Sequence, residues 1–204
     1  MTGHYAHVAF TPLVREHQRA HGSERSYDRM AQVPDVADSI GPDEAAFITE
    51  RDSFYLATVS ETGWPYIQHR GGAPGFLRVI DEHTLGFADF RGNKQYISRG
   101  NLEHDSRVAL FLMDYATQSR MKIFGRARVI EDDPDLVRAL EVDGYRAQSE
   151  RAVLIDVEAF DWNCRQHIPP LYPRAAVAEA MSSMRDRISE LEGEIARLKG
   201  EVTA

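Results

Sequence analysis

The stretch FYLATVSETGWPYIQHR, residues 54–70, contains two runs rich in β-branched and aromatic residues on either side of a short turn sequence. Residues 54–59 and 64–70 have the composition of strands, whereas 60–63 is mostly polar and ends in glycine. A short connection of this kind typically reverses the chain between two antiparallel strands. The stretch therefore predicts a β-hairpin.

The same succession of strand-like runs and short turns continues along the chain. The further predicted strands are 76–80, 84–90, 107–114, 120–130 and 152–157. Helices are predicted at 42–51, where a proline and two acidic residues suit the first turn, and at 94–101 and 134–142. Six or seven strands joined mainly by hairpins predict a mainly β, α+β fold with an antiparallel barrel rather than a parallel doubly wound sheet.

The composition limits the classes of protein to which the chain can belong. Its 204 residues are 43% hydrophobic, enough for one sizeable core with appendages. The net charge of −8 disfavours non-specific binding to nucleic acid or anionic lipid. Cys164 is the single cysteine, and no run of 18 apolar residues is present. We therefore expect a cytoplasmic protein that binds neither nucleic acid nor membrane.

Residues 1–42 are the least regular part of the sequence and form the first of three predicted regions. A helix is expected over about 11–30. His17 and His21 are spaced to share one face of that helix, but no carboxylate or cysteine stands at a supporting metal-ligand spacing. We therefore predict packed or solvated histidines and no metal site.

Residues 174–204 form the third predicted region, after the strand-rich region 43–173. Apolar residues recur there at alternating gaps of four and three, which is the spacing of a coiled-coil seam. The seam residues are Val177, Met181, Met184, Ile188, Leu191, Ile195, Leu198 and Val202. Their order and the opposite charges beside them favour a parallel two-stranded coil that assists a dimer formed elsewhere. An amphipathic helix packed on its own domain is the alternative.

A basic turn follows the predicted strand 84–90. Arg91 and Lys94 stand among small residues, and the helix predicted from Lys94 has unpaired amide groups in its first turn. Together with the helix dipole, these groups predict a binding site for phosphate. An ordinary solvent-facing connection has the same composition and is the alternative.

Two further sets of polar residues lie on predicted strands. Gln68, His69 and Arg70 end the first hairpin, and Arg120 and Lys122 share one face of a later strand. If these strands are neighbours in a small barrel, the basic groups converge on a cationic pocket for a phosphorylated aromatic ligand. Exposed strand faces with the same residues are the alternative.

The order of several motifs resembles that of a known family. These motifs are LATV at 56–59, GFADF at 86–90, RGNK at 91–94, RVALF at 107–111 and RMKIFGRARV at 120–129. Over about residues 43–170 the chain resembles the FMN-binding split-barrel family of pyridoxamine 5′-phosphate oxidase. The resemblance implies an antiparallel split β-barrel with flanking helices, and a homodimer whose two FMN sites lie at the subunit interface.

The resemblance also implies which residues hold the cofactor. The family's phosphate-binding lysine matches Lys94, and a basic residue that reaches the phosphate or ribityl chain matches Arg70. Trp162 is expected to cover the flavin from the partner subunit, with a core or interface tryptophan as the alternative. The full set of implied cofactor-binding residues is Gln68, His69, Arg70, Phe87, Ala88, Asn93, Lys94, Arg120, Lys122, Trp162 and Gln166.

The segment after Trp162 departs from the vitamin-processing enzyme of this family. Residues 165–167 repeat only the spacing of that enzyme's substrate-gripping arginine and histidine, which argues against pyridoxamine phosphate as the substrate. We expect an FMN-dependent oxidoreductase that acts on an unidentified small molecule, with the flavin carrying the redox chemistry. The alternatives are a flavin-, deazaflavin- or haem-binding protein without turnover, and a coiled-coil adaptor whose barrel has lost its ligand.

Overall fold

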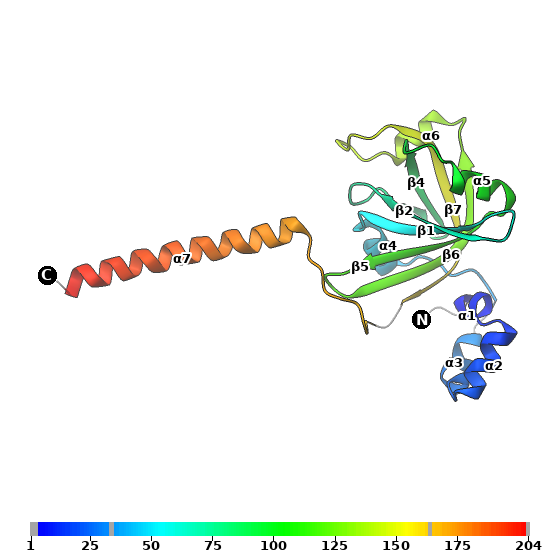
Figure 1. Ribbon diagram of the computed structural model, residues 1–204, viewed down its shortest axis with the longest axis horizontal. Coiled ribbons are helices and arrows are strands. Elements are labelled where there is room, and N and C mark those ends of the chain that lie inside the picture. Colours follow the sequence, from blue (N-terminus) through cyan, green and yellow to red (C-terminus); the bar gives the residue numbers. More distant parts are fainter. Residues whose placement is uncertain (1–3, 33–34, 163–164, 203–204) are drawn as a thin grey trace. The chain divides into compact units, whose positions relative to one another are not determined.

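The computed structural model describes residues 4–32, 35–162 and 165–202 (Figure 1). Seven strands form one antiparallel sheet in the order β2-β1-β5-β6-β7-β4-β3. The strands are β1 (Ser53–Val59), β2 (Pro65–Gly71), β3 (Arg78–Asp81), β4 (Thr84–Phe90), β5 (Arg107–Asp114), β6 (Ser119–Ile130) and β7 (Ser149–Trp162). Among the described residues β2 and β3 form the two edges, so the sheet is not closed.

This architecture confirms the predicted antiparallel α+β split barrel. The three predicted hairpins are β1–β2, β3–β4 and β5–β6. Two strands differ from their predicted bounds by more than one residue: β3 begins at Arg78 rather than at residue 76, and β7 extends beyond 152–157 at both ends. β7 pairs with β4 on one side and with β6 on the other, so residues outside its apolar run also join the sheet.

Seven helices accompany the sheet in the described residues. They are α1 (His4–Ala9), α2 (Pro12–Ala20), α3 (Glu24–Ala31), α4 (Pro42–Thr49), α5 (Ile97–His104), α6 (Pro134–Leu140) and α7 (Arg174–Val202). The helix predicted over 11–30 is instead two helices, α2 and α3, because Gly22 between them has a left-handed φ of 72°. The rings of His17 and His21 stack with their centroids 6.4 Å apart.

The inner face of the sheet carries the main hydrophobic core. Strand alternation places Phe54 and Leu56 of β1 beside Leu110 and Leu112 of β5, and all four are buried. At a bulge in β6, a side chain at Gly125 would place its Cβ 2.5 Å from a backbone oxygen of β7, so only glycine fits. Since one face of the sheet is buried, the register of each strand decides which of its polar residues point inward.

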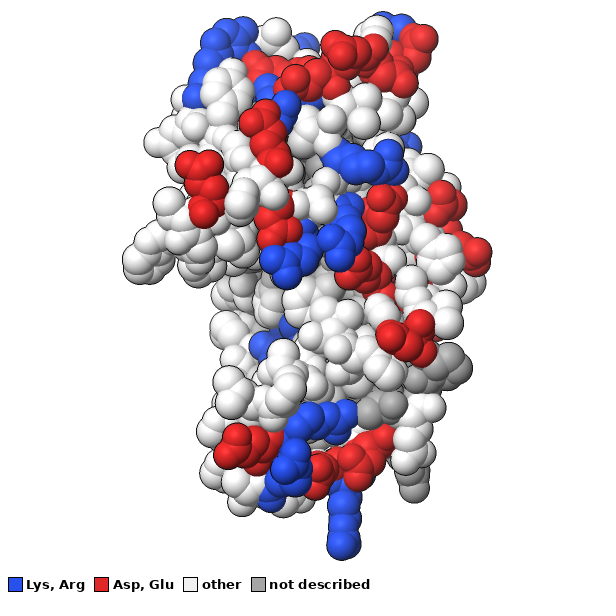
Figure 2. All heavy atoms as spheres, turned by 90° about the vertical axis from the view of Figure 1, so that its right-hand side faces the viewer, with Lys and Arg blue, Asp and Glu red and all other residues white. Residues whose placement is uncertain are grey.

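Acidic and basic side chains lie beside one another on the face drawn in Figure 2. Two ion pairs also join β6 to β7. Arg126 Nε lies 2.6 Å from Glu158 Oε1, and Arg128 Nε lies 3.1 Å from Asp156 Oδ2. Exposed pairs of this kind contribute at most about 1 kcal/mol each to stability. Their main effect is to neutralise the basic residues of this part of β6.

The chain divides into two compact units, Met1–Asp114 with Ser119–Arg165, and Tyr115–Gln118 with Gln166–Ala204. The second unit contains α7, which runs without a break over its 29 residues (Figure 1). The boundaries of the three predicted regions stay predictions, and Cys164 lies outside the described residues. In the part of the chain that the structure describes, no helix combines the length and apolar character needed to cross a membrane.

Candidate functional site

A cavity of about 230 Å³ lies between the edge strand β2, strands β4 and β7, and helix α5. We call it the seam cavity, because β2 and β4 are not neighbours in the sheet and the barrel is open between them. The lining residues used below are Tyr66, Gln68, Arg70, Asp89, Lys94, Tyr96 and Arg151.

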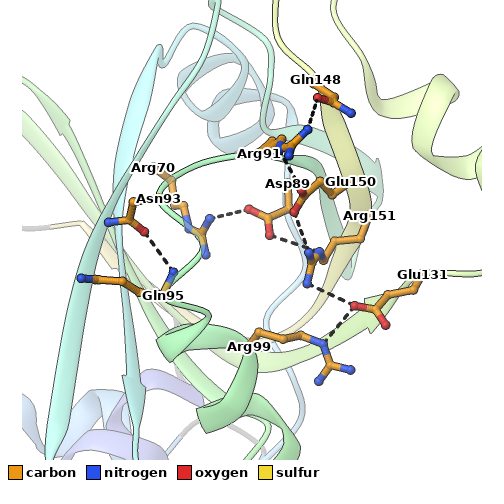
Figure 3. A network of polar contacts seen from close by, with 10 residues as sticks. All are labelled: Arg70, Asp89, Arg91, Asn93, Gln95, Arg99, Glu131, Gln148, Glu150 and Arg151. Atoms are coloured by element: carbon orange, nitrogen blue, oxygen red, sulfur yellow. Dashed lines mark hydrogen bonds and ion pairs between the residues drawn. The ribbon is translucent and has the colours of Figure 1, made fainter.

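A row of charged side chains crosses this opening (Figure 3). Arg70 of β2 pairs with Asp89 of β4 through its Nη1 atom. Asp89 stands opposite Arg151 of β7 in the strand register, and Arg151 Nε lies 3.7 Å from Asp89 Oδ2. One carboxylate therefore lies between two guanidinium groups. Because all three side chains are largely buried, loss of Asp89 would remove the carboxylate that both guanidinium groups share.

The row continues from Arg151 toward α5. Arg151 Nη2 lies 2.8 Å from Glu150 Oε2, and its Nη1 lies 3.1 Å from Glu131 Oε1. Arg99 of α5 shares the same Glu131 oxygen at 3.2 Å. This network ties α5 to the end of β6 and to β7, and it holds the Arg151 guanidinium in a fixed position beside the cavity (Figure 3).

Two hydrogen bonds fix α5 to the first hairpin. Ser98 donates to the side-chain oxygen of Gln68 at 2.8 Å, and Asn101 donates to the hydroxyl of Thr58 at 2.9 Å. The second of these bonds is buried, where an unpaired amide or hydroxyl costs about 1–3 kcal/mol. The position of α5 over the cavity is therefore specified by polar contacts on both of its sides.

The seam cavity is basic within an acidic protein. Its ionised lining residues are four cations and two anions, namely Arg70, Lys94, Arg99 and Arg151 against Asp89 and Glu150. Burial raises the pKa of the Asp89 carboxyl, and the neighbouring Arg70 and Arg151 offset only part of this effect. The excess of positive charge, in a chain of net charge −8, favours an anionic ligand here.

Residues 92–96, in the loop between β4 and α5, form one rim of the cavity. The prediction that a helix starts at Lys94 is wrong, since α5 begins at Ile97. Lys94 and Tyr96 have φ values of 60° and 54°, a left-handed conformation that a helix does not allow. Such residues cost on the order of 1 kcal/mol each and are concentrated at functional sites. A phosphate here would meet the loop and its lysine rather than the first turn of a helix.

The Lys94 ammonium is available to a ligand. Lys94 is exposed at the rim and makes no ion pair within the described residues. Asn93 supports the turn before it, because its side-chain oxygen accepts a hydrogen bond from the Gln95 amide at 3.2 Å. Asn93 therefore stabilises the loop, and Lys94 provides the positive charge.

The predicted site residues fall on two faces of the sheet. Those that line the seam cavity are Gln68, Arg70, Asn93 and Lys94. Phe87 and Ala88 are buried residues of β4. The Arg70 guanidinium carbon lies 5.9 Å from the Phe87 ring centroid. Phe87 therefore contacts the Arg70 guanidinium through its aromatic ring.

His69, Arg120 and Lys122 lie on the opposite, outer face, because successive strand residues point to opposite sides. Lys122 Nζ contacts the Tyr5 hydroxyl and lies 3.6 Å from Asp161 Oδ2. The Arg120 Nε atom is buried and has no hydrogen-bond partner among the described residues. Within one chain the basic groups therefore do not converge on a single pocket, and the role of these three as cofactor contacts stays a prediction.

The outer face around these residues is apolar. A shallow groove of about 220 Å³ on it is lined mainly by hydrophobic residues of β1, β2, β5 and β6. We call this surface the outer apolar face, and its members are Tyr55, Ala57, Ile67, Ala109, Phe111 and Phe124. Ile67 is 63% exposed, and Tyr5 of α1 covers one end of the face by stacking on Phe124 at 5.5 Å. An exposed surface of this kind marks an interaction site.

Trp162 is the last residue of β7, and Gln166 follows it in sequence. The Trp162 indole donates to Glu44 Oε1 of α4 at 3.0 Å, and its ring packs edge-on against Phe47 at 4.7 Å. These contacts match the alternative reading of Trp162 as a packing residue, and its contact with a flavin stays a prediction. Gln166 lies in an exposed turn of the second compact unit.

Sequence reasoning missed Asp89, Arg151 and the contribution of Arg99. Asp89 and Arg99 lie in the basic stretch around Lys94, but the predicted site does not include them. Arg151 lies directly before the predicted last strand, 152–157, whereas in the structure it belongs to β7. A charged residue directly before the apolar run 152–155 was the available signal, since only an acidic neighbour such as Asp89 makes its burial tolerable.

The residues present fit a ligand that combines an anionic group with a flat aromatic ring. Arg70 Nε is buried at the cavity and has no hydrogen-bond partner in the described part of the chain, although such atoms are normally paired. Together with Lys94 it offers charged donors of the kind that bind phosphate. Tyr66 and Tyr96 supply aromatic surface in the same cavity.

Solved structures with a similar fold were found by comparison with known proteins. A solved structure of HupZ from Group A Streptococcus is 16% identical, and the match covers 65% of this chain and 99% of HupZ with a TM-score of 0.51. An FMN-binding protein from Syntrophomonas wolfei is 11% identical over 73% of this chain and 96% of its own, with a TM-score of 0.49. The likeness to HupZ shows a shared fold, and no curated protein matches in sequence.

The family assignment comes from the sequence model of one protein family. The model described as pyridoxamine 5′-phosphate oxidase matches residues 40–166, which is more than half of the chain and includes all seven strands. The matched range contains every lining residue of the seam cavity. The chain therefore belongs to the pyridoxamine 5′-phosphate oxidase family.

Proposed function

We propose that the protein is an FMN-dependent oxidoreductase that acts on a small molecule and works as a homodimer. The observation that carries this proposal is the seam cavity, where Lys94 and Arg70 offer charged donors beside the aromatic rings of Tyr66 and Tyr96. A phosphate with a flat ring system attached matches this combination of groups. Membership of the family supports the same cofactor class.

In this proposal the chain's residues have distinct tasks. Lys94 and Arg70 bind the phosphate, and Asp89 and Phe87 position Arg70. When bound, the flavin supplies the redox chemistry, and the protein supplies binding, orientation and electrostatics. A deazaflavin has the same phosphate and flat ring, so the cavity does not discriminate between the two cofactors by charge alone.

The division of the predicted residues between two faces supports a second copy as part of the site. Arg120 and Lys122 point away from the seam cavity of their own chain, on the outer apolar face. In a two-fold dimer formed through this face, each chain's outer residues approach the ligand of the other chain. The buried, unpartnered Nε of Arg120 is the group that we assign to such a contact.

The first test is the absorption spectrum of the purified protein before and after addition of FMN, with the released ligand identified by mass. Bands of oxidised flavin would support the proposal, and rapid reduction of that flavin by NADH or NADPH would support turnover. A protein that stays colourless and ignores FMN would refute the cofactor assignment. Bound flavin that no donor reduces would favour a binding protein.

The second test is Lys94→Ala. Loss of a charge-assisted contact to phosphate weakens binding by about 1.5–3 kcal/mol, so the dissociation constant for FMN should rise roughly 10- to 100-fold. Arg126→Ala is the matched control, because this side chain pairs with Glu158 on the surface, away from the cavity lining. Equal affinities in Lys94→Ala and the control would remove Lys94 from the site.

A further inference from the structure

Helix α7 presents a continuous apolar stripe. The helix spans Arg174–Val202, and at about 1.5 Å per residue it is about 43 Å long. All side chains described in it are exposed. The stripe residues Val177, Met181, Met184, Ile188, Leu191, Ile195 and Leu198 are each between 41% and 67% exposed. Seven large hydrophobic side chains in one exposed row mark an interaction surface.

The positions around the stripe follow a heptad repeat. With Met181, Ile188 and Ile195 at a and Met184, Leu191 and Leu198 at d, the two glycines of the helix, Gly193 and Gly200, both fall at f. Position f is the one furthest from the partner in a two-stranded coil. A Cβ at Gly193 would meet no atom within 4 Å, so this glycine serves no packing within the chain. The glycines lower the helix propensity of α7, but they do not remove side chains from the a and d positions.

The charges that flank the stripe are complementary to a copy of themselves. Arg187 and Glu194 stand at g, and Glu192 and Lys199 at e. In a parallel pair, g of one helix meets e of the next heptad on the other, which joins Arg187 to Glu192 and Glu194 to Lys199. Each attraction occurs twice, because the two chains are identical. A different protein partner would need a matching pattern of its own, whereas a second copy has it already.

We propose that α7 binds α7 of a second copy as a parallel, in-register, two-stranded coiled coil. Isoleucine at a and leucine at d in the C-terminal half favour this oligomer state. The residues of this interface are different from those of the outer apolar face. It therefore does not depend on the cofactor, and its test needs no flavin, so failure here is distinguishable from failure of the proposed function.

The first experiment places one cysteine in the stripe of the full chain. In a Cys164→Ser background, Leu198→Cys brings two thiols together only if the helices are parallel and in register, since identical d positions then face each other. Ala196→Cys is the matched control at position b, outside the seam. Mild oxidation should form covalent dimers at least about tenfold faster with Leu198→Cys than with Ala196→Cys. Equal rates would overturn the proposal.

The second experiment tests the orientation by exchanging charges in the Leu198→Cys chain. Arg187→Glu should slow disulfide formation roughly fivefold, because each attraction with Glu192 becomes a repulsion. Arg187→Glu combined with Glu192→Arg should restore the rate in a parallel coil. In an antiparallel coil Arg187 faces Glu194 and Arg185 faces Glu192, so the double variant would create repulsion at both places and stay slow.

Each result of these experiments decides the proposal. Restoration supports the parallel pair, and a slow double variant overturns it. A helix packed on its own domain would give slow oxidation that none of the charge changes affects. The exposed 2.9 Å ion pair between Arg187 and Glu190 is lost in both charge variants, so it does not contribute to the difference between them. Circular dichroism of each variant checks that α7 remains helical.

Discussion

The inner and outer sides of strand β2 have opposite characters, although their residues alternate along one stretch of sequence. On the inner side Gln68 accepts a hydrogen bond from α5 and Arg70 pairs with Asp89. On the outer side Ile67 lies 63% exposed in an apolar groove, with His69 beside Tyr55. The inner side carries a network of ion pairs and hydrogen bonds beside a cavity, whereas the outer side is an exposed apolar surface.

The difference supports our proposal that a second chain completes the site. A strand has only two sides, so a stretch such as 68–70 necessarily sends neighbouring residues in opposite directions. Residues on both sides can serve the same ligand only if a second chain brings its outer side to the first chain's inner side. The predictions below test this dependence, and the effects become smaller from one to the next.

The largest effect is expected from a charge in the outer apolar face. Ala57→Glu places a carboxylate among Tyr55, Ile67, Ala109 and Phe111, where dimer formation would remove it from water. We expect the dissociation constant of the dimer to rise at least about 100-fold. Sedimentation equilibrium measures it, in chains that also carry Leu191→Lys so that α7 does not hold two copies together.

The control for this prediction is Thr62→Glu in the same Leu191→Lys background, which adds the same charge at the exposed turn of the same hairpin. Circular dichroism and the melting temperature show whether the Ala57→Glu monomer is folded. If it is not, Ile67→Lys on the edge strand replaces it, because a side chain that is 63% exposed tolerates a charge in the monomer. A folded Ala57→Glu chain that dimerises like its control would contradict a role of this face in assembly.

The second effect is complementation between two defective chains. Arg70→Ala damages the inner side and Arg120→Ala the outer side, so each variant alone should lose FMN affinity. After subunit exchange in an equal mixture, half of the dimers contain one chain of each kind, and one of their two sites is intact. About a quarter of all sites should therefore regain wild-type affinity, as fluorescence titration with FMN can measure. No recovery in the mixture would place Arg120 outside the shared site.

The sequence predicted the sheet well and the site only in part, for a physical reason. Hairpins such as β5–β6 are local, so alternation and turn residues were enough to predict them. The Asp89–Arg151 pair joins strands far apart in sequence, and its existence depends on the register of β4 with β7. The prediction of a helix start at Lys94 is wrong, because Lys94 and Tyr96 adopt left-handed backbone conformations. Neither residue is glycine, so the sequence does not indicate these conformations.

The smallest effect concerns the pH dependence of stability at the inner side. Burial raises the pKa of Asp89 above its ordinary value of 3.8. Between the unfolded and the raised folded pKa, the native protein holds a proton that the unfolded chain has lost. The free energy of unfolding contributed by this group therefore falls as pH rises through that interval. Asp89→Asn removes the titration, so wild type should lose stability relative to the variant as the pH increases.

The matched control is Asp105→Asn, which should change stability with the opposite sign. Side-chain and backbone hydrogen bonds from Arg107 hold the pKa of Asp105 well below its ordinary value. Its contribution is present above the ordinary value and is lost as pH falls, so wild type should gain stability relative to Asp105→Asn with rising pH. Urea unfolding at a series of pH values measures both differences. Slopes of the same sign would mean that Arg70 and Arg151 outweigh burial at Asp89, and the inner network would then attract anions less strongly than its four cations imply.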